Sequence, residues 1–191
     1  MKEPIDLNEQ LKSLIINGKG NNEYIVWFKT IAELLMKNFN IETSNKRYKI
    51  LEIEFYYYSR DHEDESTYGF MKYGKHKNER IQEFKKKQCN PLTWFIHYSG
   101  IDLVIGSDSN PGGILIRKIK DITSEEKIFT GPYVSMLELI NQATEIDEGN
   151  FKLKLIPNTN NDNISLKYKK RHGIGKNAGK YADENYNFYI E

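Results

Sequence analysis

The strongest constraint on the fold is the run YKILEIEFYYY at residues 48–58, which is rich in aromatic and β-branched side chains. This composition, with polar and apolar positions alternating through its centre, predicts a β-strand. In a strand, Glu52, Glu54 and Tyr56 point to one face, while the intervening apolar residues point to the other. Two carboxylates on one face of such a strand either line a cleft or stand in solvent on an edge strand.

The rest of the chain predicts two helices and several further strands. Apolar residues at helical spacing predict a helix at 24–39, and Pro132 in the first turn favours another at 131–143. Residues 92–106 predict two strands with a tight connection at Ser99–Gly100. The other predictions are strands at 114–119, 151–156 and 187–190, and loops at 59–70, 107–113 and 158–163. Together these elements predict one α+β domain with mostly antiparallel neighbouring strands.

The length of 191 residues is typical of one domain. We expect residues 23–191 to form it and residues 1–22 to form an N-terminal extension. Cys89 is the only cysteine and cannot form an internal disulfide, which favours a reducing, cytoplasmic compartment. No stretch approaches the roughly 18 apolar residues of a membrane span. We therefore expect a monomer without a membrane partner.

Positive charge is concentrated in two segments, although the net charge is only +1. Residues 71–87 hold seven Lys and Arg against two Glu, and residues 167–180 hold six Lys and Arg with no acid. The two segments therefore carry +5 and +6, and the rest of the chain carries −10. This distribution suits either a polyanion-binding face that includes Lys170, Arg171 and Lys176, or two solvated loops.

Several familiar motifs can be excluded. The stretch GIGKNAGK at 173–180 lacks the Walker A spacing, and Tyr181 follows it where Ser or Thr is needed. The histidines and the lone cysteine show no metal-ligand spacing, and no nucleophile elbow is present. We therefore expect neither a metal nor a cofactor.

Arg117 lies near the end of the apolar run GGILIRKI at 112–119. An arginine is rarely buried without a partner. A carboxylate on a neighbouring strand is the natural one. Such a pair is either a structural ion pair or a guanidinium that helps to hold a reacting water.

The order of these motifs resembles that of the alkyladenine (3-methyladenine) DNA glycosylase family. The helix sequence AELLMKNF ahead of the long strand also fits, so the similarity runs from about Ile31 to Ile190. The resemblance implies a single α+β domain around a curved antiparallel sheet, without a metal. The motifs that carry it are E-x-E-x-Y at 52–56, the aromatic hairpin ending at Gly100, GGILIR at 112–117, GP at 131–132, R-x-G-I-G at 171–175 and FYI at 188–190.

The resemblance also implies roles for individual residues. Glu54 matches the catalytic carboxylate that activates a water against the deoxyribose. Arg117 matches the arginine that positions this water, and His172 matches a residue whose backbone carbonyl contacts it. Tyr56 matches an aromatic residue that packs on the extruded base.

Three positions depart from the family pattern. Tyr68 stands where a base-stacking histidine is usual. Ser99 replaces a tyrosine that wedges into DNA, so that His97 and Tyr98 become the alternatives. Gly106 replaces an asparagine of the pocket wall, which implies a roomier pocket and a bulkier base.

These observations predict a monofunctional DNA glycosylase that acts on double-stranded DNA. It would extrude a damaged or modified base, hydrolyse the N-glycosidic bond and leave an abasic site. The excised base would be an alkylated purine or a hypermodified phage base, and the second substrate would imply antiviral defence. The main alternative is a nucleic-acid-binding module without chemistry, and a nuclease is less favoured because metal-ligand clusters are missing from the sequence.

Overall fold

The computed structural model describes residues 6–20, 23–68, 79–107, 110–124, 126–143, 146–147, 150–151, 153–158, 164–174 and 179–191. Its helices are α1 (Leu7–Asn17), α2 (Tyr24–Asn38), α3 (Glu79–Lys87) and α4 (Pro132–Gln142). Its strands are β1 (Phe39–Glu42), β2 (Arg47–Ser59), β3 (His62–Glu63), β4 (Trp94–His97), β5 (Gly100–Val104), β6 (Gly112–Asp121), β7 (Ile128–Thr130), β8 (Ile146–Asp147), β9 (Asn150–Phe151), β10 (Lys154–Pro157), β11 (Lys167–Lys169) and β12 (Asn187–Tyr189).

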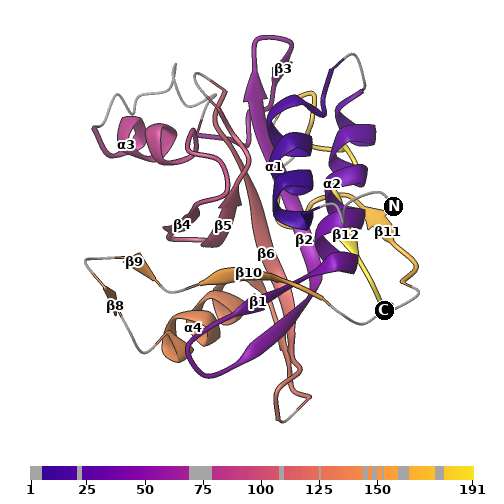
Figure 1. The fold of residues 1–191 in the computed structure, drawn as a ribbon. Coiled ribbons are helices and arrows are strands. Elements are labelled where there is room, and N and C mark those ends of the chain that lie inside the picture. The colour runs from indigo at the N-terminus through magenta and orange to yellow at the C-terminus, as the bar shows by residue number, and fades with distance from the viewer. Residues whose placement is uncertain are drawn as a thin grey trace.

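The sheet is organised around β2 and β6, which run side by side through the middle of the molecule (Figure 1). The strand order is β10-β1-β2-β6-β5-β4, and these neighbours pair antiparallel. On its other edge β2 pairs first with β1 and then with β12. The pairing of β2 with β6 shifts register on both sides of Glu52. Such irregularities bend a strand, and the sheet curls accordingly.

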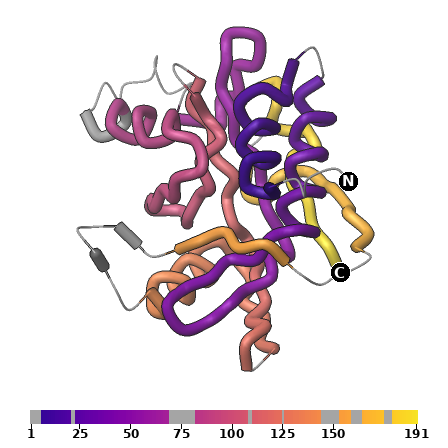
Figure 2. Tube along the Cα trace, viewed as in Figure 1, coloured from indigo at the N-terminus to yellow at the C-terminus, as the bar shows by residue number. Residues whose placement is uncertain are grey.

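One face of β2 forms the aromatic core that the alternating sequence predicted. Phe55 stacks on Phe28 of α2 with ring centroids 4.6 Å apart, and Phe188 of β12 meets the Phe55 ring edge-on. Figure 2 shows why this contact is possible, because the first and last described parts of the chain lie together against β2. Residues 1–22, expected as an extension, include α1, which buries Leu11 and Ile15 in the same core.

The structure confirms the coarse α+β class and most of the predicted elements. The predicted strand at 151–156 is wrong as a single element, since Phe151 belongs to β9 and Lys154–Pro157 forms β10 against β1. Helices α1 and α3 and strands β1, β3, β7, β8 and β11 were not predicted. No helix within the described ranges is long and apolar enough to cross a membrane.

A buried histidine joins the end of β2 to the C-terminal segment. His62 is fully buried, its Nδ1 lies 2.9 Å from the Tyr57 carbonyl oxygen, and its Nε2 lies 3.0 Å from the Tyr186 hydroxyl. Because a carbonyl only accepts, Nδ1 carries the proton, and Nε2 accepts from Tyr186. The ring also packs on Tyr24 and Tyr181, with centroids 4.1 and 3.9 Å apart. Burial lowers the pKa of His62 below its ordinary value.

We expect this histidine to make folding sensitive to mild acid. The unfolded chain binds a proton at its ordinary pKa, about 6.5, before the folded chain does. The free energy of unfolding should therefore fall as the pH is lowered from about 7 to 5.5. Urea titrations across this range should show the slope, and His62→Phe should reduce it. His172→Phe is the control, since the His172 side chain is exposed. An equal slope in the His62 variant would contradict the assignment.

Candidate functional site

The polar face of the sheet carries a cavity of about 360 Å³. Glu54 of β2 and Asp102 of β5 both pair with Leu115 of β6, so the three side chains lie in one row on the same face. The backbones of Glu54 and Asp102 are therefore two strand spacings apart, a distance of roughly 10 Å. The residues that line the cavity are Tyr56, Ser66, Thr67, Tyr68, Gln88, His97, Tyr98, Ser99, Asp102, Leu115, Arg117, Pro132, His172, Gly173 and Ile174.

Glu54 is fully buried, and hydrogen-bond donors surround both of its oxygens. Oε2 accepts from the Tyr56 hydroxyl at 2.9 Å and from Arg117 Nη1 at 3.0 Å. Oε1 accepts from the backbone N–H of His172 at 2.6 Å and from Asn187 Nδ2 at 2.8 Å. Three of these donors belong to residues of the cavity wall, whereas Glu54 itself lies behind the wall. The arrangement presents a carboxylate that is one hydrogen bond away from the cavity.

The predicted carboxylate–arginine pair is therefore present, and it includes Glu52. Arg117 Nε lies 3.5 Å from Glu52 Oε1, and Asn187 Nδ2 also donates to Glu52 at 2.8 Å. Burial alone would raise the pKa of Glu52, but the bonds from Asn187 and Lys169 and the charges of Lys169 and Arg117 outweigh it and lower the pKa. Arg117 thus bridges two carboxylates, which fixes the orientation of its guanidinium.

Tyr56 connects the cavity to Glu54. Its hydroxyl is held by Glu54, and its ring faces the Arg171 guanidinium at 4.8 Å. Burial and the neighbouring Glu54 carboxylate raise the pKa of Tyr56. The phenol therefore stays protonated at neutral pH and acts as a donor to Glu54.

A second polar group lies on the cavity wall formed by β4, β5 and the end of α3. His97 Nε2 lies 3.1 Å from Asp102 Oδ1, and Gln88 Nε2 donates to Asp102 Oδ2 at 3.0 Å. The Tyr68 hydroxyl is 3.4 Å from His97 Nδ1. Gly113 makes room for this cluster, because a Cβ there would meet the Asp102 carboxylate at 2.4 Å. We call Tyr68, Gln88, His97 and Asp102 the inner wall.

Of the residues that the resemblance assigned, two lie at the cavity. The two hairpin residues, His97 and Tyr98, differ in how far their side chains are exposed. Tyr68 and His172 both line the cavity, although the atom of His172 that contacts Glu54 is its N–H and not its carbonyl. Tyr98 is 69% exposed on the β4–β5 turn, as a DNA-contacting residue would be. His97, predicted for the same contact, instead has a side chain only 7% exposed and bonded to Asp102.

The prediction that Arg171 contacts DNA is wrong. Its side chain is fully buried and forms a bidentate pair with Asp64, at 2.6 and 3.1 Å. It also donates to the carbonyl oxygens of Phe55 and Tyr181. A guanidinium held in this way is not available to a phosphate.

Three other cations of the basic segment at 167–180 have acidic partners, whereas Lys180 lies over the Tyr181 ring. Lys170 pairs with Asp183 at 2.7 Å, and Lys169 with Glu52 at 3.2 Å. Lys167 pairs with Glu191. Lys176 lies outside the described residues. The charge excess in the sequence of this segment is therefore largely compensated in the fold.

Gly106 does not enlarge the cavity, so that inference from the resemblance is wrong. It is not one of the lining residues. A Cβ at this position would meet the Gln88 carbonyl oxygen at 2.0 Å and the Asn110 carbonyl oxygen at 2.5 Å. The glycine is needed because backbone approaches closely here, and the argument for a bulkier base from its missing side chain does not hold.

Sequence reasoning missed three residues of the site. Asp102 is the only acid in the apolar strand IDLVI, and a lone buried carboxylate of this kind was a usable signal. Gln88 follows a lysine run that drew attention to charge alone. Asn187 reaches Glu54 only because β12 pairs with β2, and nothing local in the sequence indicates that.

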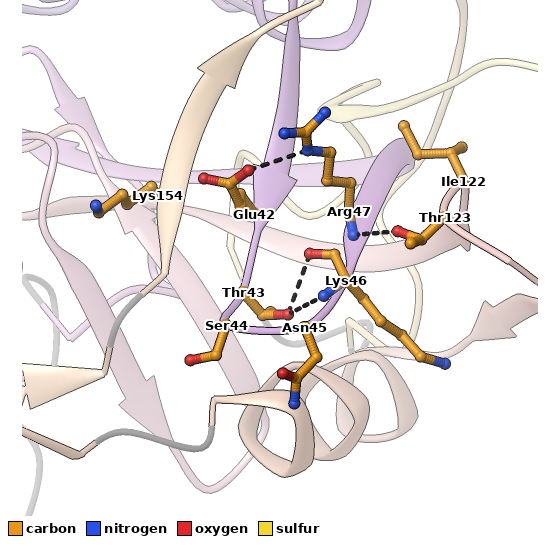
Figure 3. A pocket seen from close by; sticks show the side chains of 9 residues that line it. All are labelled: Glu42, Thr43, Ser44, Asn45, Lys46, Arg47, Ile122, Thr123 and Lys154. Atoms are coloured by element: carbon orange, nitrogen blue, oxygen red, sulfur yellow. Dashed lines mark hydrogen bonds and ion pairs between the residues drawn. The ribbon is translucent and has the colours of Figure 1, made fainter.

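A larger hollow of about 760 Å³ lies at the β1–β2 turn (Figure 3). It shares no lining residue with the cavity beside Glu54. Its polar groups are mostly bonded to one another or to nearby acids. Arg47 Nε binds Glu42 at 3.0 Å, and Arg47 N donates to Thr123. Lys46 pairs with Asp121 at 2.9 Å. These contacts account for the groups as parts of the hairpin.

Within the described part of the chain, no group of three or more His, Cys, Asp or Glu side chains could hold a metal ion. The chain matches no protein-family model, and a search of curated proteins finds no similar sequence. The case for a function therefore depends on the geometry of the cavity.

Proposed function

We propose that this chain is a monofunctional DNA glycosylase that hydrolyses the N-glycosidic bond of a base extruded into the cavity. The observation that carries the proposal is the buried Glu54, which is paired with Arg117 in the wall of a cavity of about 360 Å³. This volume falls within the range of about 300–1,000 Å³ that small-molecule sites occupy. A base inside a duplex is unreachable, so the enzyme must act on a flipped nucleotide.

The cavity offers an aromatic and cationic wall for the extruded base. Tyr56 and Tyr68 supply rings at the lining, and stacking on an aromatic ring stabilises a base by about 1–3 kcal/mol. Tyr98, exposed on the β4–β5 turn, would fill the gap left in the duplex. Stacking in the cavity and insertion of Tyr98 together offset the few kcal/mol that unstacking the base costs.

Activation of water requires a rearrangement at Glu54. Its two oxygens already accept from donors on both sides, so no lone pair faces the cavity. When a base packs on the Tyr56 ring, the Tyr56 hydroxyl turns away from Glu54. Glu54 Oε2 then becomes available to a water held by Arg117. The carboxylate then accepts a proton from that water and stabilises the positive charge of the oxocarbenium-like sugar.

We propose hydrolysis without strand cleavage. A lyase step needs an amine at the sugar, and no lysine occurs among the described residues that line the cavity. The products are a free base and an abasic site. Phosphate contacts would come from the lysines in the last turn of α3, next to Gln88 of the cavity wall.

One observation favours a second candidate, a nucleic-acid-binding module without chemistry. Glu54 is fully buried, and every donor around it is satisfied, as in a structural ion pair. In that case the cavity would accept a base and release it unchanged.

An abasic-site assay across a panel of duplexes separates the two. We expect the protein to generate abasic sites in alkylated DNA or in hypermodified phage DNA, and not in an unmodified duplex. The measurement is alkali-labile cleavage after incubation, with an alkali-free sample to detect lyase activity. Binding without abasic sites in any DNA would favour the module, and strand breaks without alkali would contradict a monofunctional enzyme.

A further inference from the structure

The inner wall contains a buried hydrogen-bond acceptor without a donor. Gln88 is 3% exposed and lines the cavity. Its Oε1 has no hydrogen-bond partner among the described residues. An unmade bond at a buried polar atom costs about 1–3 kcal/mol, so such an atom in a ligand cavity indicates a group that the ligand supplies.

The chemistry of its neighbours fixes which amide atom is left over. Asp102, when ionised, can only accept hydrogen bonds. The Gln88 atom 3.0 Å from Asp102 Oδ2 must therefore be the NH₂ group, and Oε1 is the atom that remains. His97 supports this assignment of the Gln88 amide, because its Nε2–H donates to Oδ1, the other oxygen of Asp102. The inner wall consequently contains one acceptor beside the cavity that has no donor among the described residues.

A second atom of the same cavity points to the same conclusion. The hydroxyl of Ser66, another lining residue, is buried and has no hydrogen-bond partner among the described residues. A hydroxyl can serve as donor or acceptor, so it adapts to the ligand, whereas Gln88 Oε1 can only accept. The ligand must therefore bring at least one donor.

We propose that the cavity selects a base that carries an exocyclic amino group, and that Gln88 Oε1 accepts the hydrogen bond from this group. The inference deepens the proposed glycosylase function and rests on it for the identity of the ligand as a base. A site built to bond a donor discriminates against an analogue that lacks it, because its own acceptor is then left unpaired.

Matched ligands that differ only in the amino group test the proposal without any need for catalysis. Adenine is compared with purine, and cytosine with pyrimidin-2-one, each methylated at the nitrogen that bears the sugar in DNA. Binding is followed by protein NMR titration. We expect the wild-type protein to prefer the amino member of at least one pair by about 10-fold to 100-fold. Equal affinities in both pairs, the opposite preference, or no binding of any ligand would overturn the proposal.

Asp102→Asn is the sharper test, because it reverses the polarity of the inner wall. The asparagine keeps its carbonyl toward His97 and offers its NH₂ to Gln88. Gln88 then accepts with Oε1 and presents its own NH₂ to the cavity. We expect the amino preference to fall at least tenfold, to parity or reversal. Asp183→Asn, which alters an exposed carboxylate that is not among the residues lining the cavity, should keep the preference. An unchanged preference in folded Asp102→Asn protein would show that Gln88 does not read the base.

These outcomes are separable from the fate of the glycosylase proposal. An amino preference in binding without abasic-site formation would uphold the inner wall as a base reader and reject the enzyme. Base release without an amino preference would support the enzyme and reject the inner wall as a base reader.

Discussion

Glu54→Gln is expected to reduce base release by about 10²–10⁴-fold while DNA affinity stays within a few-fold of the wild type. The amide cannot take a proton from water, and it removes the negative charge that stabilises the sugar in the transition state. DNA contacts are unaffected, because Glu54 is fully buried behind the cavity wall. The measurement is single-turnover formation of abasic sites, with binding followed by fluorescence anisotropy.

The variant must be studied at a temperature where it is folded. One side of the glutamine amide becomes an NH₂ group that faces donors, either Tyr56 and Arg117 or His172 and Asn187. We expect a loss of about 1–3 kcal/mol in the free energy of unfolding for this mismatch. Circular dichroism melts of both proteins determine the working temperature.

Glu52→Gln is the matched control for Glu54→Gln. Glu52 lies on the same strand face and shares Arg117 and Asn187, but the cavity-wall residues Tyr56 and His172 donate to Glu54. Its lowered pKa means that it stabilises the fold above its unfolded pKa and that this contribution is lost as the pH falls. The control should therefore lower stability with little effect on the chemical step. Equal losses of activity in both variants would mean that Glu54 acts through the fold alone.

The long strand shows how much of this site was accessible from sequence. Period-two alternation in residues 48–58 correctly placed Glu54 and Tyr56 on one face. Because a buried arginine needs a partner, the sequence also correctly predicted a carboxylate on a neighbouring strand for Arg117, although it did not by itself select Glu54. Both inferences depend on local geometry or on the chemistry of one side chain. The cavity itself requires β4, β5 and the end of α3 to fold over that face, and no local pattern specifies their approach.

The basic segment at 167–180 shows why charge counting failed. Lys170 finds its partner 13 residues away along the chain, but Arg171 finds Asp64 at a separation of 107 residues. A run of cations in the sequence appears unneutralised until such distant acids are placed. The inference of a roomier pocket from Gly106 was wrong for a related reason. The glycine is required by close backbone contacts with Gln88 and Asn110, which the sequence does not reveal.

Arg171→Met is expected to cost about 3–5 kcal/mol in the free energy of unfolding, since it leaves the Asp64 carboxylate buried without its cation. Methionine fills much of the space of the arginine stem, so the loss reports mainly on the charge and its hydrogen bonds. Urea denaturation monitored by tyrosine and tryptophan fluorescence gives the value. Lys170→Met is the matched control on the neighbouring residue, and it should leave stability essentially unchanged because the Lys170–Asp183 pair is exposed.

The double variant Arg171→Met with Asp64→Leu separates pairing from packing. Removal of both charges takes away the unpaired carboxylate, so the double variant should be more stable than Arg171→Met alone. Additive losses would show that the two side chains act independently. The same proteins also test the exclusion of Arg171 from DNA contacts. A phosphate contact would make the folded Arg171→Met protein bind DNA more weakly with a shallower salt dependence, whereas a residue enclosed by Asp64, Phe55 and Tyr181 leaves both unchanged.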